Sequence, residues 1–309
     1  MAKPRISYVN GRYLPYDSAY IHIEDRGILF SDGVYEGILI KDNTLIDFDL
    51  HLERLKYSLD VIKIDHVMSV AAIKNIIRQL QSRNKSKDGF VYLQVTRGTS
   101  PRNHVFPKDS TPSLIITIHP PRNLPQKIYD EGAKIIIRDD NRWARKDAKT
   151  ISLLPNILVK EEAAQEGALE AWQVKNGVIT EGGASNAFIV DKNGVLRTHK
   201  ASHDILGGIV RKRVIQLAKE NNIIDVQEEA FTEKDVYEAR EVFGTSTTMK
   251  IVPITKIEES KISDGKPGKI TLELSKLYEE MMIGQINSGQ DNLVQSGFGR
   301  LNEGSKYGK

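Results

Sequence analysis

Cysteine is absent from this chain of 309 residues. The absence excludes disulfides, thiolate zinc sites and a cysteine nucleophile, and it is typical of a cytoplasmic protein, which is the location we expect. Long apolar runs are also missing. No run approaches the roughly 18 residues of a membrane-spanning helix, and the N-terminal stretch MAKPRISYVNGRYLP lacks an apolar signal segment. The sequence therefore predicts neither a membrane span nor a secretory leader.

The chain also has little net charge, because 44 Lys and Arg residues nearly balance 41 Asp and Glu residues and leave a net charge of +3. The two signs are mixed along the chain, which excludes a nucleic-acid footprint and a polybasic membrane arm. The seven histidines are scattered without an HExxH motif, and His199 and His203 stand four apart in a segment typical of a turn, so we expect no metal site. The glycine motifs GxxxxGK[ST], GxGxxG and GxSxG are missing too, which argues against common nucleotide loops and a hydrolase triad.

The patterns that are present predict an α+β fold in two domains. Asn10-Gly11 favours a type I′ hairpin, and apolar residues at helical spacing predict helices over 51–63 and 70–82. A second hairpin over 36–48 and strands over 90–96 and 114–118 complete the first half. The second half is predicted to contain strands or hairpins over 133–138, 171–180 and 187–198, a short strand over 242–244, and helices over 156–167, 208–221, 233–239 and 271–283.

A proline-rich stretch divides the two halves. Pro120, Pro121 and Pro125 break regular structure, which predicts an interdomain linker over 120–126. The expected domains are therefore 1–119 and 127–284. Residues 285–309 are rich in Gly, Ser, Asn and Gln, and we expect a poorly ordered tail there.

Lys149 and Glu181 are the first candidates for chemistry. A single lysine is most often a solvent-exposed surface residue. Lys149, however, precedes the apolar segment SLLPNIL, and a partly desolvated lysine can act as a covalent catalyst by forming a Schiff base. Glu181 ends a strand-like run and meets Gly182-Gly183, where it is placed to tune whatever Lys149 holds.

Three further elements could bind an anion. Gly207-Gly208 opens a helix, and a helix N-terminus favours anions, although a bare Gly-Gly pair is a weak signal. The hydroxyl run 245–248 follows a strand and is either a polar turn or a phosphate cup. Arg54 lies on the predicted helix 51–63, where a solvated helix face is the simpler interpretation and a phosphate ligand the alternative.

The loop RGTSPRNHVFP, residues 97–107, could bind a carboxylate. Arg97, Arg102 and His104 fall within eight residues of one another, and prolines stiffen the loop, although a plain surface loop is the simpler interpretation. Tyr35 lies on a likely strand, where it belongs either to the core or to a site.

Taken together, these segments identify the chain as similar to the fold-type IV pyridoxal-phosphate aminotransferases, the family of branched-chain and D-amino acid aminotransferases. The resemblance runs from about Tyr8 to Met282. It implies a smaller N-terminal α/β sandwich domain and a larger C-terminal domain with a β-barrel-like core. The segments that carry it are SDGVYEG (31–37), HLERL (51–55), RGTSPRNHVFP (97–107), RWARKDAKTISLLPNIL (142–158), VITEGGASNAFIV (178–190), ILGGIVR (205–211) and FGTSTT (243–248).

The resemblance assigns roles residue by residue, with pyridoxal 5′-phosphate as the cofactor. Lys149 resembles the lysine that forms the internal aldimine, and Glu181 resembles the carboxylate that holds the pyridine nitrogen. Leu206 would pack on the ring. The phosphate would be bound by Arg54, the backbone N–H groups of Ile209 and Val210, and the hydroxyls of Ser246 and Thr247. Val210 departs from the threonine of many relatives, and Gly183 and Ala184 replace serines found in some D-specific relatives.

The loop 97–107 most resembles the carboxylate trap of the D-amino acid aminotransferases. Arg102 and His104, with Tyr35, would bind the substrate carboxylate, and in the family the first two reach into the neighbouring subunit, which implies a homodimer with shared sites. The expected reaction is ping-pong transamination between a D-amino acid of the alanine, glutamate or aspartate class and a 2-oxo acid such as pyruvate or 2-oxoglutarate. The alternatives are a branched-chain L-aminotransferase and, less favoured, an aminodeoxychorismate lyase, an (R)-amine transaminase or a binding module without catalysis.

Overall fold

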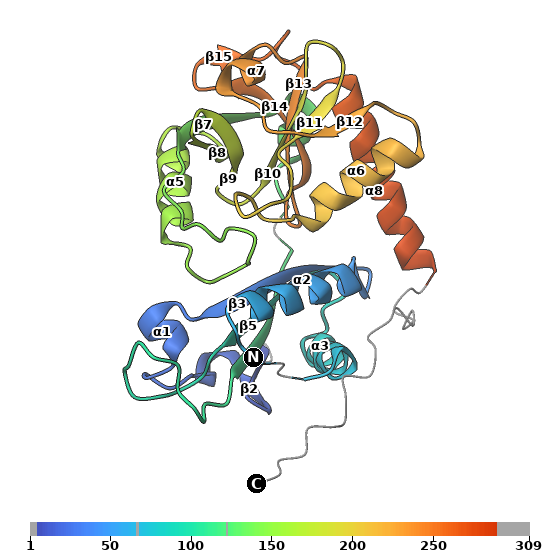
Figure 1. Ribbon diagram of the computed structural model, residues 1–309. Coiled ribbons are helices and arrows are strands. Elements are labelled where there is room, and N and C mark those ends of the chain that lie inside the picture. The colour runs from blue at the N-terminus through green and yellow to red at the C-terminus, as the bar shows by residue number, and fades with distance from the viewer. Residues whose placement is uncertain (1–4, 66–67, 122, 289–309) are drawn as a thin grey trace.

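The computed structural model describes residues 5–65, 68–121 and 123–288 (Figure 1). Its N-terminal part is built on a six-stranded antiparallel sheet in the order β2-β1-β6-β5-β3-β4. Asn10 and Gly11 both have positive φ, as the predicted hairpin requires. The strands are β1 (Ile6–Val9), β2 (Arg12–Pro15), β3 (Gly33–Lys41), β4 (Thr44–Leu45), β5 (Gly89–Thr96) and β6 (Ser113–His119).

Two amphipathic helices cover this sheet, and both were predicted. Helix α2 (Phe48–Val61) packs on β3, and α3 (Val70–Asn84) packs on β1 and β6. Ser69 caps α3 by accepting a hydrogen bond from the Ala72 N–H. The leucines and isoleucines of both helices are buried in one core with those of β3, β5 and β6. Two short helices, η1 (Tyr16–Ser18) and α1 (Arg26–Phe30), follow the first hairpin.

The C-terminal part is built on a nine-stranded mixed sheet in the order β12-β11-β10-β13-β14-β7-β8-β9, with β15 paired to β14. β9 and β10 lie against each other although they are far apart in this order, so the sheet curls into a half-barrel (Figure 1). The predicted α+β class and barrel-like core are confirmed. The strands are β7 (Ala133–Asp139), β8 (Glu170–Lys175), β9 (Val178–Gly182), β10 (Asn186–Val190), β11 (Leu196–Thr198), β12 (Val226–Glu228), β13 (Glu241–Ser246), β14 (Lys250–Ile257) and β15 (Ser260–Lys261).

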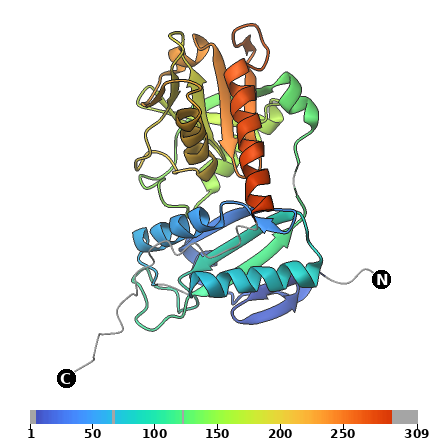
Figure 2. The ribbon, with the colours of Figure 1, turned by 90° about the vertical axis from the view of Figure 1, so that its right-hand side faces the viewer.

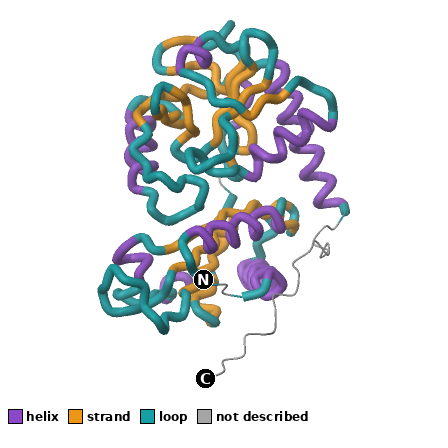
Figure 3. The backbone as a smooth tube through the Cα atoms, viewed as in Figure 1, coloured by secondary structure: helices purple, strands orange, loops and turns teal. Residues whose placement is uncertain are grey.

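Helices surround the curled sheet (Figure 3). Helix α5 packs on β8, whereas α6 and α8 pack against each other and on β13. No helix in the described part of the chain is long and apolar enough to cross a membrane. The helices are α4 (Gln126–Glu131), α5 (Leu154–Gln165), α6 (Ile209–Glu220), α7 (Glu233–Tyr237) and α8 (Lys269–Asn287).

Several elements of the C-terminal part were not predicted: α4, β12, β14 and β15. Of these, β14 contains Pro253, yet it is a central strand of the curled sheet. Helix α8 runs to Asn287, beyond the predicted end at residue 283. From residue 289 on, the predicted tail lies outside the described residues.

Helix α8 also reaches the N-terminal part at its C-terminal end (Figure 2). Asp47, which precedes α2, accepts hydrogen bonds from Gln285 of α8 at 2.9 Å and from Arg213 of α6 at 2.6 Å. The Asp47 N–H donates to the Gln285 side chain in return. These contacts fix α2 relative to α6, and the candidate site lies where these two helices approach each other.

Candidate active site

One cavity at the junction of the two parts brings together most of the residues that the sequence singled out. Tyr35 and Arg54 come from the N-terminal part, and Lys149 and Glu181 come from the C-terminal part. The other predicted residues on its wall are Leu206, Ile209, Val210, Ser246 and Thr247.

Lys149 is held at the cavity by its backbone. Its carbonyl accepts from the Tyr35 N–H at 2.9 Å, and its own N–H donates to the Ser58 hydroxyl of α2 at 3.0 Å. The Lys149 Nζ lies 4.4 Å from the centre of the Tyr35 ring. The half-buried amine therefore faces the cavity over an aromatic ring rather than bulk water.

Glu181 is a buried carboxylate on β9 with three donors around it. Arg142 donates to Oε1 at 2.5 Å, Asn186 donates to Oε2 at 2.9 Å, and the Leu206 N–H is shared between both oxygens at 3.1 and 3.0 Å. Burial raises the pKa of the Glu181 carboxyl, while Arg142 and the Leu206 N–H oppose that rise. The carboxylate offers a negatively charged acceptor to a ligand in the cavity.

The start of α6 supplies an anion site in the same cavity. Gly208 occupies its N-cap position, and no side chain caps the helix, so its first N–H groups are open to a ligand. A Cβ on Gly208 would approach the Asn186 Oδ1 to 1.9 Å, which explains why only glycine fits there. Ser246, the last residue of β13, and Thr247 line the same cavity.

Arg54 reaches the cavity from α2 within a buried polar cluster. Its guanidinium pairs with both Glu36 oxygens at 2.7 and 2.8 Å, and its Nη1 donates to the Gly207 carbonyl at 3.1 Å. His51 hydrogen-bonds to the same Glu36 at 2.7 Å. Burial opposes the charged form of Glu36, yet Arg54 and His51 hold the pKa of Glu36 below its usual range. Arg54 is thus fixed beside the start of α6 rather than solvated on a helix face.

One buried hydroxyl points to an unfilled polar role in this cavity. Thr245 is 1% exposed and lines the cavity, and its Oγ1 has no hydrogen-bond partner among the described residues. A buried hydroxyl without a partner is uncommon in native proteins. Together with the uncapped helix and the hydroxyls at 246 and 247, it makes this end of the cavity suited to a ligand with several oxygen acceptors.

Arg102 and His104 are not part of this cavity within one chain. Both are exposed, and they lie against the Phe30 ring at 5.2 and 5.3 Å respectively. Neither is among the described residues that line the cavity. No group of three or more His, Asp or Glu residues that could hold a metal ion occurs in the described part of the chain.

The polar partners of the candidate residues were not predicted from the sequence. Arg142, Asn186 and Glu36 hold Glu181 and Arg54 in place, and each lies inside a segment that the analysis quoted for its resemblance. Nothing in the spacing of the chain pairs them, because each pair is closed by strands or helices that meet only in the fold. A buried arginine beside a buried carboxylate has no local sequence signature.

Comparisons with known proteins agree with this geometry. The amino-transferase class IV model matches residues 33–257. The D-alanine aminotransferase of Bacillus licheniformis is 37% identical over 276 residues, which cover 89% of this chain and 96% of that protein. The D-alanine aminotransferase of Listeria innocua serovar 6a is 41% identical over 281 residues, which cover 89% of this chain and 95% of that protein.

Solved structures of similar fold include branched-chain amino acid aminotransferases. The one from Escherichia coli has a TM-score of 0.83 at 24% identity and covers 92% of this chain and 96% of its own. The one from Thermobaculum terrenum, in its PLP form, has a TM-score of 0.81 at 25% identity and covers 93% of this chain and 97% of its own.

Proposed function

This chain belongs to the amino-transferase class IV family, and we propose that it transfers the amino group of a D-amino acid to a 2-oxo acid with pyridoxal 5′-phosphate as cofactor. D-alanine, D-glutamate and D-aspartate are the proposed donors, and pyruvate and 2-oxoglutarate the proposed acceptors. The observation that carries the proposal is the meeting of Lys149, Glu181 and the uncapped start of α6 in one cavity. Relatives at 37% and 41% identity that are D-alanine aminotransferases support the D-amino acid class.

The donor set of the cavity fits this cofactor. A phosphate needs several donors and positive charge, which Arg54, the Ile209 and Val210 N–H groups and the hydroxyls of Ser246 and Thr247 would supply. Leu206 offers an apolar side chain to the ring. Val210 offers no hydroxyl, and the unpartnered Thr245 hydroxyl is a further donor on the same wall.

Lys149 is proposed as the catalytic residue. Its amine would hold the cofactor through the cofactor's carbonyl carbon until the substrate amine takes that place. The freed amine would then move a proton from the substrate α-carbon to the cofactor C4′ atom. The segment that carries Lys149 is fixed by Ser58 and Tyr35, so its amine would stay near both the α-carbon and the C4′ atom. One amine can then both take and deliver the proton.

Glu181 is proposed to hold the ring nitrogen in its protonated form. When bound, pyridoxal phosphate supplies an electrophilic carbonyl and a conjugated ring that accepts negative charge from the substrate. A carboxylate beside the nitrogen keeps the proton there and so strengthens that capacity. Glu181 is 4% exposed, and in such a setting its charge acts strongly on a neighbouring cation.

Substrate selection is proposed to use Tyr35 together with Arg102 and His104 of a second copy. Tyr35 lies beside Lys149, whereas Arg102 and His104 are exposed outside the cavity of their own chain. A homodimer in which each loop 97–107 closes the neighbouring cavity would bring the cationic pair to the substrate carboxylate. The side of the α-carbon facing Lys149 would then be fixed by where the carboxylate binds.

A half-reaction tests the proposal. Purified protein loaded with pyridoxal phosphate is mixed with D-alanine and, separately, with L-leucine, and the conversion of the cofactor to pyridoxamine phosphate is followed by absorbance. Conversion with D-alanine and little with L-leucine is expected. Conversion with L-leucine alone would replace the proposal with a branched-chain L-aminotransferase, and conversion with neither would remove the aminotransferase assignment for these substrates.

A further inference from the structure

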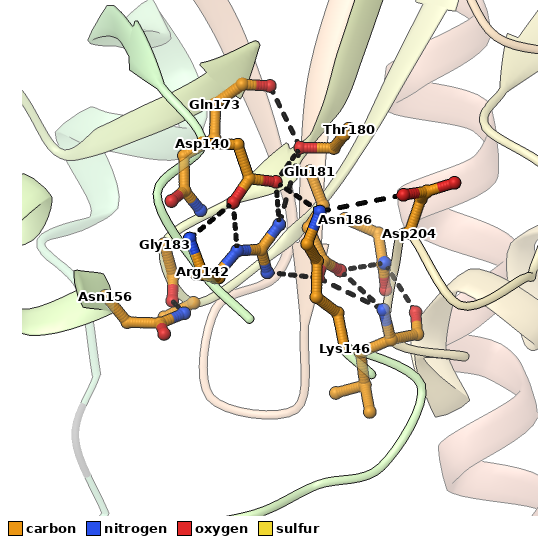
Figure 4. A network of polar contacts seen from close by, with 12 residues as sticks. Asp140, Arg142, Lys146, Asn156, Gln173, Thr180, Glu181, Gly183, Asn186 and Asp204 are labelled. Carbon is orange, nitrogen blue, oxygen red and sulfur yellow. Dashed lines mark hydrogen bonds and ion pairs between the residues drawn. The ribbon is translucent and has the colours of Figure 1, made fainter. Parts of the chain in front are cut away.

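Arg142 lies on the wall of the cavity, at the centre of a network of buried polar side chains. Its side chain is 7% exposed, and it spans two carboxylates (Figure 4). On one side, Nη1 donates to Glu181 at 2.5 Å. On the other, Nε and Nη2 donate to Asp140 at 2.9 and 2.7 Å.

We propose that Arg142 is a positioning residue that keeps Glu181 ionised and turned toward the ring nitrogen of the cofactor. The inference rests on the function proposed above, since it assigns to Arg142 a task within the same site. It predicts that the preference of the protein for a ligand with a ring nitrogen depends on Arg142, even though Arg142 would not touch that nitrogen.

The hydrogen-bond count at Glu181 supports this task. A carboxylate has about four acceptor positions, and the protein supplies three donors to them: Arg142 on Oε1, Asn186 on Oε2, and a single Leu206 N–H divided between both oxygens. Because one N–H is shared in this way, the carboxylate can still accept from a further donor. Glu181 lines the cavity, so a ligand there can supply that donor. The three protein donors fix the rotation of the carboxylate, which decides the direction from which the ligand must donate.

Asp140, on the side of the network away from Glu181, fixes the Arg142 guanidinium. Asp140 also accepts from the Thr180 hydroxyl at 2.7 Å and pairs with Lys146 at 2.9 Å. Burial opposes the charged form of Asp140, yet Arg142, Lys146 and Thr180 hold the pKa of Asp140 below its usual range. Lys146 lies 3.7 Å from the half-exposed Asp204. The ionised Asp140 therefore holds Arg142 from the side opposite Glu181. Arg142 cannot turn away from Glu181 without breaking its ion pair with Asp140.

Charge balance explains why the loss of Arg142 should act on Glu181. Asp140 and Glu181 carry two negative charges, and Arg142 and Lys146 carry two positive charges within this buried group. Removal of Arg142 leaves one excess negative charge in a region where burial already favours the neutral form of Glu181. A protonated Glu181 no longer stabilises a protonated ring nitrogen.

The test compares two ligands on cofactor-free protein. The dissociation constants of pyridoxal 5′-phosphate and of its analogue with C–H in place of the ring nitrogen are measured by absorbance titration for wild type, Arg142→Met and Arg142→Lys. The wild type should prefer the natural cofactor by about tenfold or more, the value of one good polar contact. Arg142→Met should reduce that preference to about twofold or less, with Arg142→Lys between the two.

The ratio of the two dissociation constants separates a positioning role of Arg142 from a general structural one. A purely structural role would weaken both ligands alike and leave the ratio unchanged, which would overturn the proposal. Arg138→Met is the matched control, because Arg138 pairs with Glu162, Glu166 and Glu258 away from the cavity, and it should keep the wild-type ratio.

Three further outcomes can be told apart. If Arg142→Met does not fold, the variant Asp140→Asn/Arg142→Met removes both charges of the pair and leaves no unpaired Asp140. This variant creates no excess negative charge, so the preference for the ring nitrogen should fall only through the loss of the Arg142 hydrogen bond that orients Glu181. If the wild type binds neither ligand, the proposed cofactor is wrong. If the wild type prefers the ring nitrogen and the Arg142 variants do so equally, the cofactor stands and the inference about Arg142 is wrong.

Discussion

Lys149 differs from its neighbour Lys146 in what surrounds the amine. Lys146 is 5% exposed and pairs with Asp140, whereas Lys149 faces the Tyr35 ring and forms no ion pair with a carboxylate among the described residues. A lysine tied to a carboxylate is a poor nucleophile, because the pair stabilises its protonated form. The surroundings thus favour Lys149, and not Lys146, as the amine that reacts.

Replacing Lys149 with Ala should abolish covalent attachment of the cofactor. Borohydride reduction of the loaded wild type should fix the cofactor to the peptide that contains Lys149, as read by mass spectrometry, and Lys149→Ala should show no fixed cofactor and no multiple turnover. Lys192→Ala is the control, because Lys192 pairs with Glu238 on the surface. Fixed cofactor at another lysine of the wild type would contradict the assignment.

Glu36 links the site to the stability of the protein against acid. Its pKa is held below the usual value of 4.5 by Arg54 and His51 against the cost of burial. A carboxyl with a lowered folded pKa contributes stability that is complete above its unfolded pKa and is lost as the pH falls toward the folded pKa.

Glu36→Gln should therefore reduce the acid sensitivity of the cofactor-free protein. Between about pH 5 and about pH 3, the wild type should lose roughly 1–2 kcal/mol more of its free energy of unfolding than Glu36→Gln. Urea unfolding at several pH values measures both slopes. Glu53→Gln, which changes an exposed carboxylate on the same helix, should keep the wild-type slope. Equal slopes in Glu36→Gln and the wild type would show that Glu36 is not the group responsible.

At the scale of elements, the loop after β5 is anchored at its start by Arg97. Arg97 donates to the Lys63 and Ile62 carbonyls at 2.7 and 2.6 Å, and it pairs with Asp32. Phe106 stacks on the Arg97 guanidinium at 3.6 Å. Arg97 is thus committed to holding the loop, whereas the Arg102 side chain stays exposed.

Arg102→Ala should raise the KM for D-alanine while leaving cofactor binding nearly unchanged. Loss of one charge-assisted hydrogen bond costs roughly 1.5–3 kcal/mol, or about 10- to 150-fold in affinity. Steady-state kinetics and cofactor titration measure the two effects separately. Lys108→Ala, which removes an exposed cation from the same loop, should change neither. An unchanged KM in Arg102→Ala would remove the carboxylate-binding role.

Most elements of this fold could be predicted from the sequence because their signals are local. The apolar spacing of α2 and α3 and the Asn10-Gly11 turn are visible in short windows. β14 could not be predicted in this way, because Pro253 lacks an N–H and argues against a central strand. Pro253 is nevertheless paired in register with Phe243, and the surrounding sheet decides its conformation.

The candidate site also contains residues that the sequence reveals and residues that only the fold reveals. Lys149, Glu181 and Arg54 could be singled out as candidates because they lie in contiguous segments that resemble a family, and the structure places all three on one cavity. The pairing of Arg142 with Asp140 and Glu181 could not, because it needs the end of β7 and the strand β9 to lie side by side. Partners that meet only after folding leave no spacing in the sequence.

At the scale of the whole molecule, the cavity belongs to neither sheet alone. α2 brings Arg54 from one side, and the C-terminal part brings Lys149, Glu181 and the start of α6 from the other. Asp47, Arg213 and Gln285 hold the two sides together. The division into domains at 1–119 and 127–284 stays a prediction, but a cavity shared between the two sheets requires both to be folded and joined.

A mixing experiment tests whether the cavity is also shared between two copies. Lys149→Ala and Arg102→Ala should each be nearly inactive at low D-alanine concentration. If Arg102 acts on the neighbouring cavity, random exchange of subunits makes about half of the dimers mixed, and one of the two sites in each then contains both native side chains. Activity should therefore recover to about a quarter of the wild-type value.

The mixing experiment shows whether Arg102 serves the neighbouring cavity or its own, because the two arrangements give opposite results. If Arg102 served the cavity of its own chain, every mixed dimer would still carry one site without Lys149 and one without Arg102, and mixing would restore nothing. The exposed position of Arg102 on Phe30, outside its own cavity, favours recovery. Mixing each variant with itself supplies the baseline, and mass measurement of the exchanged sample shows that mixed dimers have formed.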